Sequence, residues 1–196
     1  MQSYIIWAII SYLVGNFATS YLISRALGKI DIRQHGSGNA GATNVLRVLG
    51  LKAAIATLLG DALKGALVVA LAKHFGDIRI AMISALAVIL GHNFPALLKF
   101  KGGKGIATSI GVFFVIDPLA ALIPILIGIV IIVWSRYVSL GSISGMASLP
   151  IVLLLLGRPL DRMIFGLAVA LLAIYQHRSN IKRLLSGTEN KIGSKG

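Results

Sequence analysis

The sequence predicts an all-α integral membrane protein, a compact bundle of about seven transmembrane helices forming a single transmembrane domain over residues 1–196. Hydrophobic residues make up 57% of the chain, and the mean hydropathy is +0.88, which is too apolar for a soluble domain. The apolar residues fall into runs that approach or reach the length needed to cross a bilayer. The chain also has a net charge of +13. Its basic residues lie mostly in short segments between the runs, as is typical of a membrane protein rather than one that binds nucleic acid.

Seven apolar runs can be followed along the chain, and each is interpreted as a helix. They cover residues 4–27, 53–72, 80–98, 106–116, 119–134, 140–156 and 160–175. The fourth run is only about half a bilayer long, and the last three are rather short. Six glycines within the runs are interpreted as sites of close helix packing: Gly15, Gly60, Gly65, Gly128, Gly145 and Gly166.

The distribution of basic residues predicts the orientation, with the N-terminus outside and the C-terminus in the cytoplasm. Of the 19 Lys and Arg residues, Lys64 lies inside a run and four would lie outside, namely Lys73, Arg79, Arg158 and Arg162. The inner segments would hold the other 14: Arg25, Lys29, Arg33, Arg47, Lys52, Lys99, Lys101, Lys104, Arg136, Arg178, Lys182, Arg183, Lys191 and Lys195. If the short fourth run did not cross, the six from Arg136 onward would move outside, Arg158 and Arg162 would move inside, and the 14-to-4 asymmetry would be lost. The positive-inside rule therefore favours a fourth crossing.

Three polar segments then share the inner face: "HGSGNAGATN" (35–44), "FKGGKGIATS" (100–109) and "HRSNIKRLLSGTENK" (177–191). Polar loops are costly near lipid, because each backbone N–H and C=O needs a partner. Each segment combines basic residues with small or amide residues, a composition suited to wrapping an anion.

The second segment has the composition of a phosphate site. Gly102, Gly103 and Gly105 permit close approach of the backbone, Lys104 adds a full charge, and the run that follows would present amides at a helix N-terminus. The spacing of a Walker A loop is absent. A flexible turn carrying positive-inside lysines is the alternative.

The first segment offers exposed backbone at Gly36 and Gly38 and neutral donors at Ser37, Asn39 and Asn44. Arg47 follows Asn44 by three residues, which places both on one face if a helix begins there. A guanidinium grips phosphate or carboxylate through a planar fork. The alternative is a helix start capped by Thr43 or Asn44, and the two interpretations are compatible.

In the third segment, His177 ends the last run and Asn180 would share its face on a continuing helix; an interfacial histidine is the alternative. Asp61 and Lys64 lie three apart within a run and can pair, with a structural or a functional role both open. We interpret His92 and Asn93 as partners for backbone or neighbouring loops.

Several kinds of chemistry are excluded by residues that the sequence lacks. The six acidic residues are scattered, there is no cysteine, and no His/Cys/Asp set has the spacing of a zinc site. Neither an HxxxxD motif nor a G-x-S-x-G elbow occurs. We therefore expect no metal and no cofactor, and an enzyme that works by binding and orienting anionic substrates. The alternatives are an organophosphate or anion transporter, although no internal repeat is present, and a membrane scaffold.

The chain resembles the bacterial acyl-phosphate:glycerol-3-phosphate acyltransferase family of integral membrane enzymes. The resemblance rests on three motifs in the family's order, "GSGNAGATNVLR" (36–47), "GHNFPALLKFKGGKGIAT" (91–108) and "HRSNIKRLLSGTENK" (177–191). It implies a fold of seven helices in the bacterial cytoplasmic (inner) membrane, with the active site facing the cytoplasm. It also implies the first acylation of phospholipid synthesis, in which acyl phosphate and glycerol 3-phosphate give lysophosphatidic acid and inorganic phosphate.

The resemblance also implies roles for individual residues. The loop from Gly102 to Gly105, with Lys104, would hold the phosphate of glycerol 3-phosphate. The first motif would hold the acyl phosphate, while His177 and Asn180 would orient substrate. The expected catalytic residues are Ser37, Arg47, Lys104, His177 and Asn180, and the expected substrate-binding residues are Gly36, Gly38, Asn39, Asn44, Gly102, Gly103 and Gly105.

The orientation can be tested with reporter fusions. Because the charge split favours a fourth crossing, a reporter fused after Arg136 should report the cytoplasm, and one inserted near Arg158 should report the outside. Finding Arg136 outside would remove the fourth crossing and separate the first two polar segments from the third.

Overall fold

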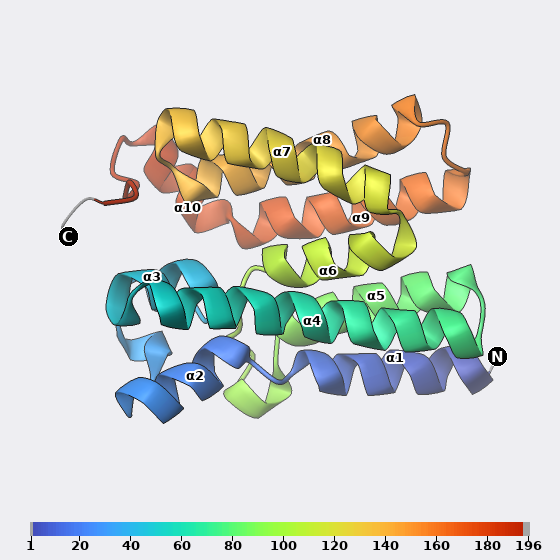
Figure 1. Cartoon of the computed structure of the whole chain (residues 1–196), viewed down its shortest axis with the longest axis horizontal. Helices are drawn as coiled ribbons and strands as arrows, with labels where there is room; N and C mark the ends of the chain where they lie inside the picture. The colour runs from blue at the N-terminus through green and yellow to red at the C-terminus, as the bar shows by residue number, and fades with distance from the viewer. Residues whose placement is uncertain (1, 194–196) are drawn as a thin grey trace. The chain divides into compact units, whose positions relative to one another are not determined.

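The computed structural model describes residues 2–193, so Lys195 of the charge pattern lies outside the described residues. The fold is all-α, and the chain divides into two compact units, one ending at Ile116 and the other beginning at Asp117 (Figure 1). Each unit is described by itself below.

The first unit contains six α-helices and two short 3₁₀ turns within its described part. The helices are α1 (Gln2–Gly15), α2 (Thr19–Gly28), α3 (Ala42–Leu49), α4 (Leu51–Phe75), α5 (Ile78–Asn93) and α6 (Ile106–Ile116), and the turns are η1 (Ile32–Gln34) and η2 (Ala96–Leu98). Helix α5 packs against α1, and α4 packs against α5 and α6, so that these helices run side by side (Figure 1). The predicted run 106–116 coincides with α6.

Two of the predicted runs in this unit are not continuous helices. The run 4–27 is broken at residues 16–18, where the Asn16 side chain donates a hydrogen bond of 2.6 Å back to the Tyr12 carbonyl. The run 80–98 ends as an α-helix at Asn93, because Pro95 lacks an N–H and disfavours a helical conformation in the residue before it. Each run still corresponds to one candidate span, Gln2–Gly28 and Ile78–Leu98, but the sequence did not predict the break inside it, and both breaks lie near the polar loops.

Glycines in this unit permit close contact between helix backbones, as predicted. A Cβ atom at Gly15 would collide with the backbone of α5, and one at Gly65 would lie 2.7 Å from the Thr108 carbonyl of α6. Small residues of this kind let helices approach closely, so that van der Waals packing holds them together in lipid, where the hydrophobic effect does not favour their association.

The second unit contains α7 (Pro118–Ser135), α8 (Val138–Leu155), α9 (Leu160–Gln176) and α10 (Arg178–Leu185). Helices α7 and α8 run side by side, as do α8 and α9 (Figure 1). Close glycine contacts recur, since a Cβ atom at Gly145 would lie 2.6 Å from the Pro124 carbonyl. Asp117 accepts a hydrogen bond from Ala120 at the start of α7 and forms an ion pair of 2.6 Å with Arg158.

Apolar side chains face outward over the helices, as expected for surfaces in contact with lipid. Trp134 is 85% exposed and Leu155 is 80% exposed. Within residues 2–193, five helical segments are long and apolar enough to cross a membrane, or six if α9 and α10 form one bent span, and α6 is a shorter apolar helix. The predicted class, an all-α integral membrane protein, is consistent with this pattern, while the number of crossings and the orientation stay predictions.

Candidate functional site

The first glycine-rich loop is folded around one buried side chain, Asn44. Its amide nitrogen donates to the carbonyls of Ile32 and His35, at 3.1 and 2.9 Å, and its Oδ1 accepts from the Ser37 amide at 2.8 Å. Asn44 is 1% exposed. A buried amide with three hydrogen bonds fixes the backbone it contacts, so Asn44 determines where the Ser37 backbone lies.

The exposed part of this loop runs from Gln34 to Gly38. Gly36 and Gly38 have φ of +59° and +71°, a backbone conformation that residues other than glycine rarely adopt. A Cβ atom at Gly36 would also collide with Asn44 Oδ1. Glycine at position 36 is therefore required for Asn44 to enter the loop. The result is a tight turn that presents Ser37 to its surroundings while Asn39 is half-buried.

The start of helix α3 differs from the predicted cap. Gly41 precedes the helix and no side chain caps it, so the prediction of Thr43 or Asn44 as N-cap was wrong. The physical reason is that the Asn44 side chain turns back to the loop instead of bonding the helix amides. Arg47, one turn further on, is exposed, whereas Asn44 is buried.

The second loop is pressed against the end of α5 and against the first loop. The Gly103 amide donates to the His92 carbonyl at 3.1 Å, and a Cβ atom at Gly103 would lie 2.7 Å from the Ala40 carbonyl. A Cβ atom at Gly102 would collide with the His92 carbonyl, and Gly105 has φ of +78°. These glycines are needed for packing of the loop itself. They bring the two predicted phosphate loops into contact, with Lys104 half-buried between Gly103 and Gly105.

A buried ionic network lies behind the second loop. Lys64 Nζ is 2.8 Å from Asp61 Oδ1, 2.8 Å from the Phe17 carbonyl and 2.9 Å from His92 Nδ1. Asp61 and His92 are 1% and 3% exposed. The predicted pairing of Asp61 with Lys64 is therefore confirmed, and the ammonium also satisfies a carbonyl left open by the break between α1 and α2.

His92 contacts both charged groups of the network through Nδ1. Its Nδ1 is nearer to Lys64 Nζ, at 2.9 Å, than to Asp61 Oδ1, at 3.4 Å. An ammonium can only donate, so we assign Nδ1 as the acceptor and place the ring proton on Nε2. Nε2 faces Gly103, since a Cβ atom there would collide with it. The sequence indicated only that His92 would satisfy backbone or neighbouring loops; its link to Lys64 was missed, because 28 residues separate the two.

The third polar segment begins at a break in the helix. Helix α9 ends at Gln176, α10 begins at Arg178, and their axes differ by 59°. The helix does not continue through His177 to Asn180, which was the condition for the two residues to share a helix face. His177 Nδ1 lies 2.7 Å from the Ala173 carbonyl. Because a carbonyl only accepts, Nδ1 carries a proton, and in the neutral ring Nε2 is the basic nitrogen. Both His177 and Asn180 are buried.

Glu189 anchors this segment, and the sequence prediction missed it. Its Oε1 accepts from Asn180 at 2.8 Å and from Ser139 at 3.0 Å, while its Oε2 accepts from Arg183 at 2.7 Å. Burial would raise the pKa of Glu189, but the hydrogen bonds from Asn180, Arg183 and Ser139 outweigh it and hold the pKa below the ordinary value of 4.5. The sequence offered one indication of this anchor, since Glu189 is the only acidic residue after Asp161 and the basic residues of the segment would need a partner.

Within residues 2–193, no three His, Cys, Asp or Glu side chains are grouped so as to hold a metal ion. The prediction that the protein works without a metal stays a prediction. Lys104, Arg47 and the backbone amides of the glycine-rich loops are donors suited to phosphate.

Together these features define an integral membrane protein with two adjoining glycine-rich loops, each with a cation on it or beside it. The chain belongs to the glycerol-3-phosphate acyltransferase family, whose pattern it matches over residues 5–187. Curated relatives support this. It is 55% identical to "Glycerol-3-phosphate acyltransferase" of Alkaliphilus metalliredigens (strain QYMF), over 94% of each chain. It is 51% identical to the protein of that description from Thermoanaerobacter pseudethanolicus, over 97% of this chain and 96% of the relative.

Solved structures agree with the family assignment. The chain is similar to the glycerol 3-phosphate form of PlsY (YgiH), described as an integral membrane glycerol 3-phosphate acyltransferase. The TM-score is 0.92 and the identity 39%, covering 97% of this chain and 96% of that one. The lysophosphatidic acid form of PlsY gives a TM-score of 0.90. The resemblance inferred from the three motifs is thereby confirmed, as is the predicted class of an all-α membrane protein.

Stability measurements on charge variants can decide whether the Asp61–Lys64 pair is structural. Lys64→Met should lower the free energy of unfolding in detergent by about 3–5 kcal/mol, because it leaves a buried carboxylate unpaired. The double variant Asp61→Leu/Lys64→Met should recover most of that loss. A double variant that is stable yet lacks activity would assign the pair a functional role. Equal stability of the wild type and Lys64→Met would contradict the network.

The Glu189 anchor should make stability depend on pH. A carboxyl whose pKa is lowered on folding contributes stability that is complete above its ordinary value of 4.5 and is lost as the pH falls through the lower folded value. The melting temperature of the wild type should therefore fall below about pH 4.5. Glu189→Gln should be less stable at neutral pH, by about 1–3 kcal/mol, and should lose less on acidification. Asp161→Asn, at an exposed acidic residue on α9, is the control and should retain the wild-type profile.

Proposed function

We propose that this protein transfers a fatty acyl group from acyl phosphate to glycerol 3-phosphate. The hydroxyl oxygen of glycerol 3-phosphate attacks the acyl carbonyl carbon, and a new ester bond forms. The bond from the carbonyl carbon to the phosphate oxygen breaks, and inorganic phosphate leaves with its electron pair. The products are lysophosphatidic acid and phosphate. Membership of the family supports the acceptor, and the absence of a recognisable nucleophile motif favours direct attack.

The second loop is assigned to the phosphate of glycerol 3-phosphate. Lys104 supplies a full charge and lies just before α6, where a helix N-terminus favours an anion. The Gly103 amide donates to the His92 carbonyl, so it fixes the loop, and the neighbouring amides are the donors assigned to phosphate. The packing of Gly103 against His92 and Ala40 holds this backbone in place before a ligand arrives. Preorganised donors stabilise charge without reorganisation during the reaction.

The first loop is assigned to the acyl phosphate. Ser37, Gly38 and Asn39 surround the turn that Asn44 fixes, and Arg47 is exposed on the helix that follows. Arginine can bind a phosphate through two parallel hydrogen bonds and can polarise the carbonyl as negative charge develops. Gly36 and Asn44 contribute by shaping the turn. We assign His177 and Asn180 to substrate orientation, as the family resemblance implies.

The hydroxyl proton has a chemically suitable acceptor in the substrate itself. The second pKa of a phosphate monoester is near 6, close to the operating pH, which suits a general base. The histidine nearest to Ser37 in sequence, His35, is exposed and contributes its carbonyl, not its ring, to the bond with Asn44. We therefore propose direct attack without an acyl-serine intermediate.

The observation that carries the proposal is the contact between the two loops at Gly103 and Ala40, within a chain of this family. The reaction brings two phosphate groups together, and two adjoining anion sites meet that need. We place the protein in the bacterial inner membrane with the loops facing the cytoplasm, where the basic segments lie according to the charge pattern.

Purified protein in detergent, given acyl phosphate and glycerol 3-phosphate, tests the activity. The expected result is release of inorganic phosphate with formation of lysophosphatidic acid in the absence of any sealed compartment. No product in detergent, together with glycerol 3-phosphate uptake by vesicles containing the protein, would instead support a transporter.

Kinetic constants of loop variants test the assignment of the two phosphates. Lys104→Ala should raise the Michaelis constant for glycerol 3-phosphate roughly ten- to a hundredfold, because a charge-assisted hydrogen bond contributes about 1.5–3 kcal/mol. Arg47→Ala should instead lower turnover, if it acts on charge that develops in the transition state. Lys52→Ala, at an exposed lysine on α4, is the control for a change in surface charge. An unchanged Michaelis constant in Lys104→Ala would contradict the assignment.

Mass spectrometry after incubation with acyl phosphate alone tests direct attack. Ser37→Ala should keep measurable turnover, and the wild type should trap no acyl group. Recovery of an ester on Ser37 would establish a covalent intermediate and overturn the mechanism.

A further inference from the structure

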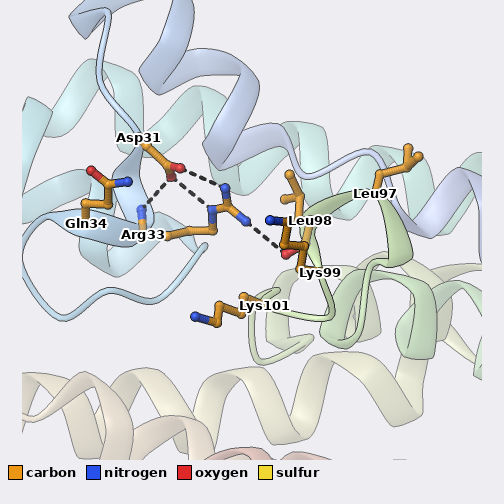
Figure 2. A pocket seen from close by; sticks show the side chains of 7 residues that line it. All are labelled: Asp31, Arg33, Gln34, Leu97, Leu98, Lys99 and Lys101. Atoms are coloured by element: carbon orange, nitrogen blue, oxygen red, sulfur yellow. Dashed lines mark hydrogen bonds and ion pairs between the residues drawn. The ribbon is translucent and has the colours of Figure 1, made fainter.

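A cation-lined pocket lies in the first unit, outside the residues assigned to the reaction. Its volume is about 260 Å³, and it is lined by Asp31, Arg33, Gln34, Leu97, Leu98, Lys99 and Lys101 (Figure 2). It is bounded by η1, which follows α2, and by the η2 segment, which follows α5. Both α2 and α5 belong to candidate membrane spans. The pocket is therefore located where two candidate spans end.

Arg33 forms the rigid wall of this pocket and does not supply its net charge. Its guanidinium bonds both Asp31 carboxylate oxygens, at 3.0 and 2.7 Å, and the Leu98 carbonyl at 2.9 Å. Figure 2 shows the guanidinium lying between Asp31 and Leu98. These hydrogen bonds lower the pKa of Asp31 and raise that of Arg33, so the pair stays ionised and nearly neutral as a unit. The bond to Leu98 also ties η1 to η2.

The net positive charge of the pocket comes from Lys99 and Lys101. Both are exposed, and Figure 2 shows Lys101 extending toward the Arg33 side of the pocket. Lys99 and the residue after it, Phe100, have φ of +55° and +61°. Two consecutive residues other than glycine in the left-handed region are uncommon, and such strain persists only where surrounding contacts enforce it. The turn alternates lysine, phenylalanine and lysine at the surface.

Large apolar side chains adjoin these lysines. Leu97, which lines the pocket, is 71% exposed, and Phe100 is 63% exposed. A free phosphate ion gains no binding energy from apolar neighbours. A lipid with an anionic headgroup is stabilised by both cations and apolar side chains, because its phosphate pairs with cations and its acyl chains pack on apolar surface.

We propose that this pocket binds the phosphate headgroup of an anionic membrane phospholipid. Lys99 and Lys101 contact the phosphate, the ion pair of Arg33 with Asp31 forms the back of the pocket, and Leu97 and Phe100 contact the acyl chains. None of its residues is among those given a role in the proposed reaction: Phe100 and Lys101 open the second polar segment, and the phosphate of glycerol 3-phosphate is assigned to Gly102–Gly105. The proposal stands whether or not that reaction is correct.

Native mass spectrometry of the purified protein tests the proposal, by measuring the dissociation constant of the first bound lipid. The probes are phosphatidylglycerol, which is anionic, and phosphatidylcholine, which is zwitterionic. Lys99→Gln/Lys101→Gln should weaken binding of phosphatidylglycerol by roughly 30-fold, about fivefold for each lysine, and leave phosphatidylcholine unchanged. The control Lys29→Gln/Lys52→Gln removes two exposed lysines outside the pocket and should change binding by less than about threefold.

A second pair of variants tests the apolar half of the site. Leu97→Ser/Phe100→Ser should weaken phosphatidylglycerol but not glycerophosphoglycerol, which carries the headgroup without chains. All four residues are exposed, so unchanged melting temperatures should show that the variants fold. An equal loss in the Lys29/Lys52 control, or equal affinity for phosphatidylcholine, would overturn the proposal. Displacement of the lipid by inorganic phosphate at a comparable concentration would overturn the choice of lipid as occupant.

Discussion

A single ammonium group inside a membrane span holds together the part of the fold on which the loops depend. Lys64 Nζ bonds Asp61, His92 and the Phe17 carbonyl, and so joins three separate segments of the first unit. Lipid offers no partner for the carbonyls that a broken helix exposes, so the break between α1 and α2 requires an internal donor. A lysine can meet that need because its three protons point to three acceptors. The position of His92, and with it the support beneath Gly103, follows from this arrangement.

The glycines of the two loops act mainly through packing, which differs from the usual account of a flexible phosphate loop. At Gly36 a side chain would exclude Asn44, and at Gly103 it would exclude the His92 ring and the Ala40 carbonyl. The backbone is therefore set before any ligand binds. Preorganised amides of this kind lose little entropy on binding an anion, and they keep their direction while charge develops.

The sequence predicted most helices well because hydrophobicity and length are local properties of the chain. The run 106–116 matched α6, and α7, α8 and α9 were placed within about two residues. Prediction failed where a distant group decides the outcome. The break after Gly15 depends on Lys64, 49 residues away, and Asn44 was taken for a cap because its partners, Ile32 and His35, precede the helix. In the third segment, Glu189 organises Asn180 from nine residues away, a contact that no periodicity reveals.

Two carboxylates of the second unit, Asp117 and Glu189, also bear on the order in which the chain is assembled. Asp117 starts α7 and binds Arg158, 41 residues later, and Ser139 on α8 binds Glu189, 50 residues later. During synthesis Asp117 and Ser139 are made before the helices and segments that carry their partners. Until Arg158 emerges, Asp117 depends on water or on the amide of Ala120, and Ser139 stays without its partner until almost the whole chain exists. The Glu189 contacts are therefore the last of these to form, and they mark the completion of the second unit.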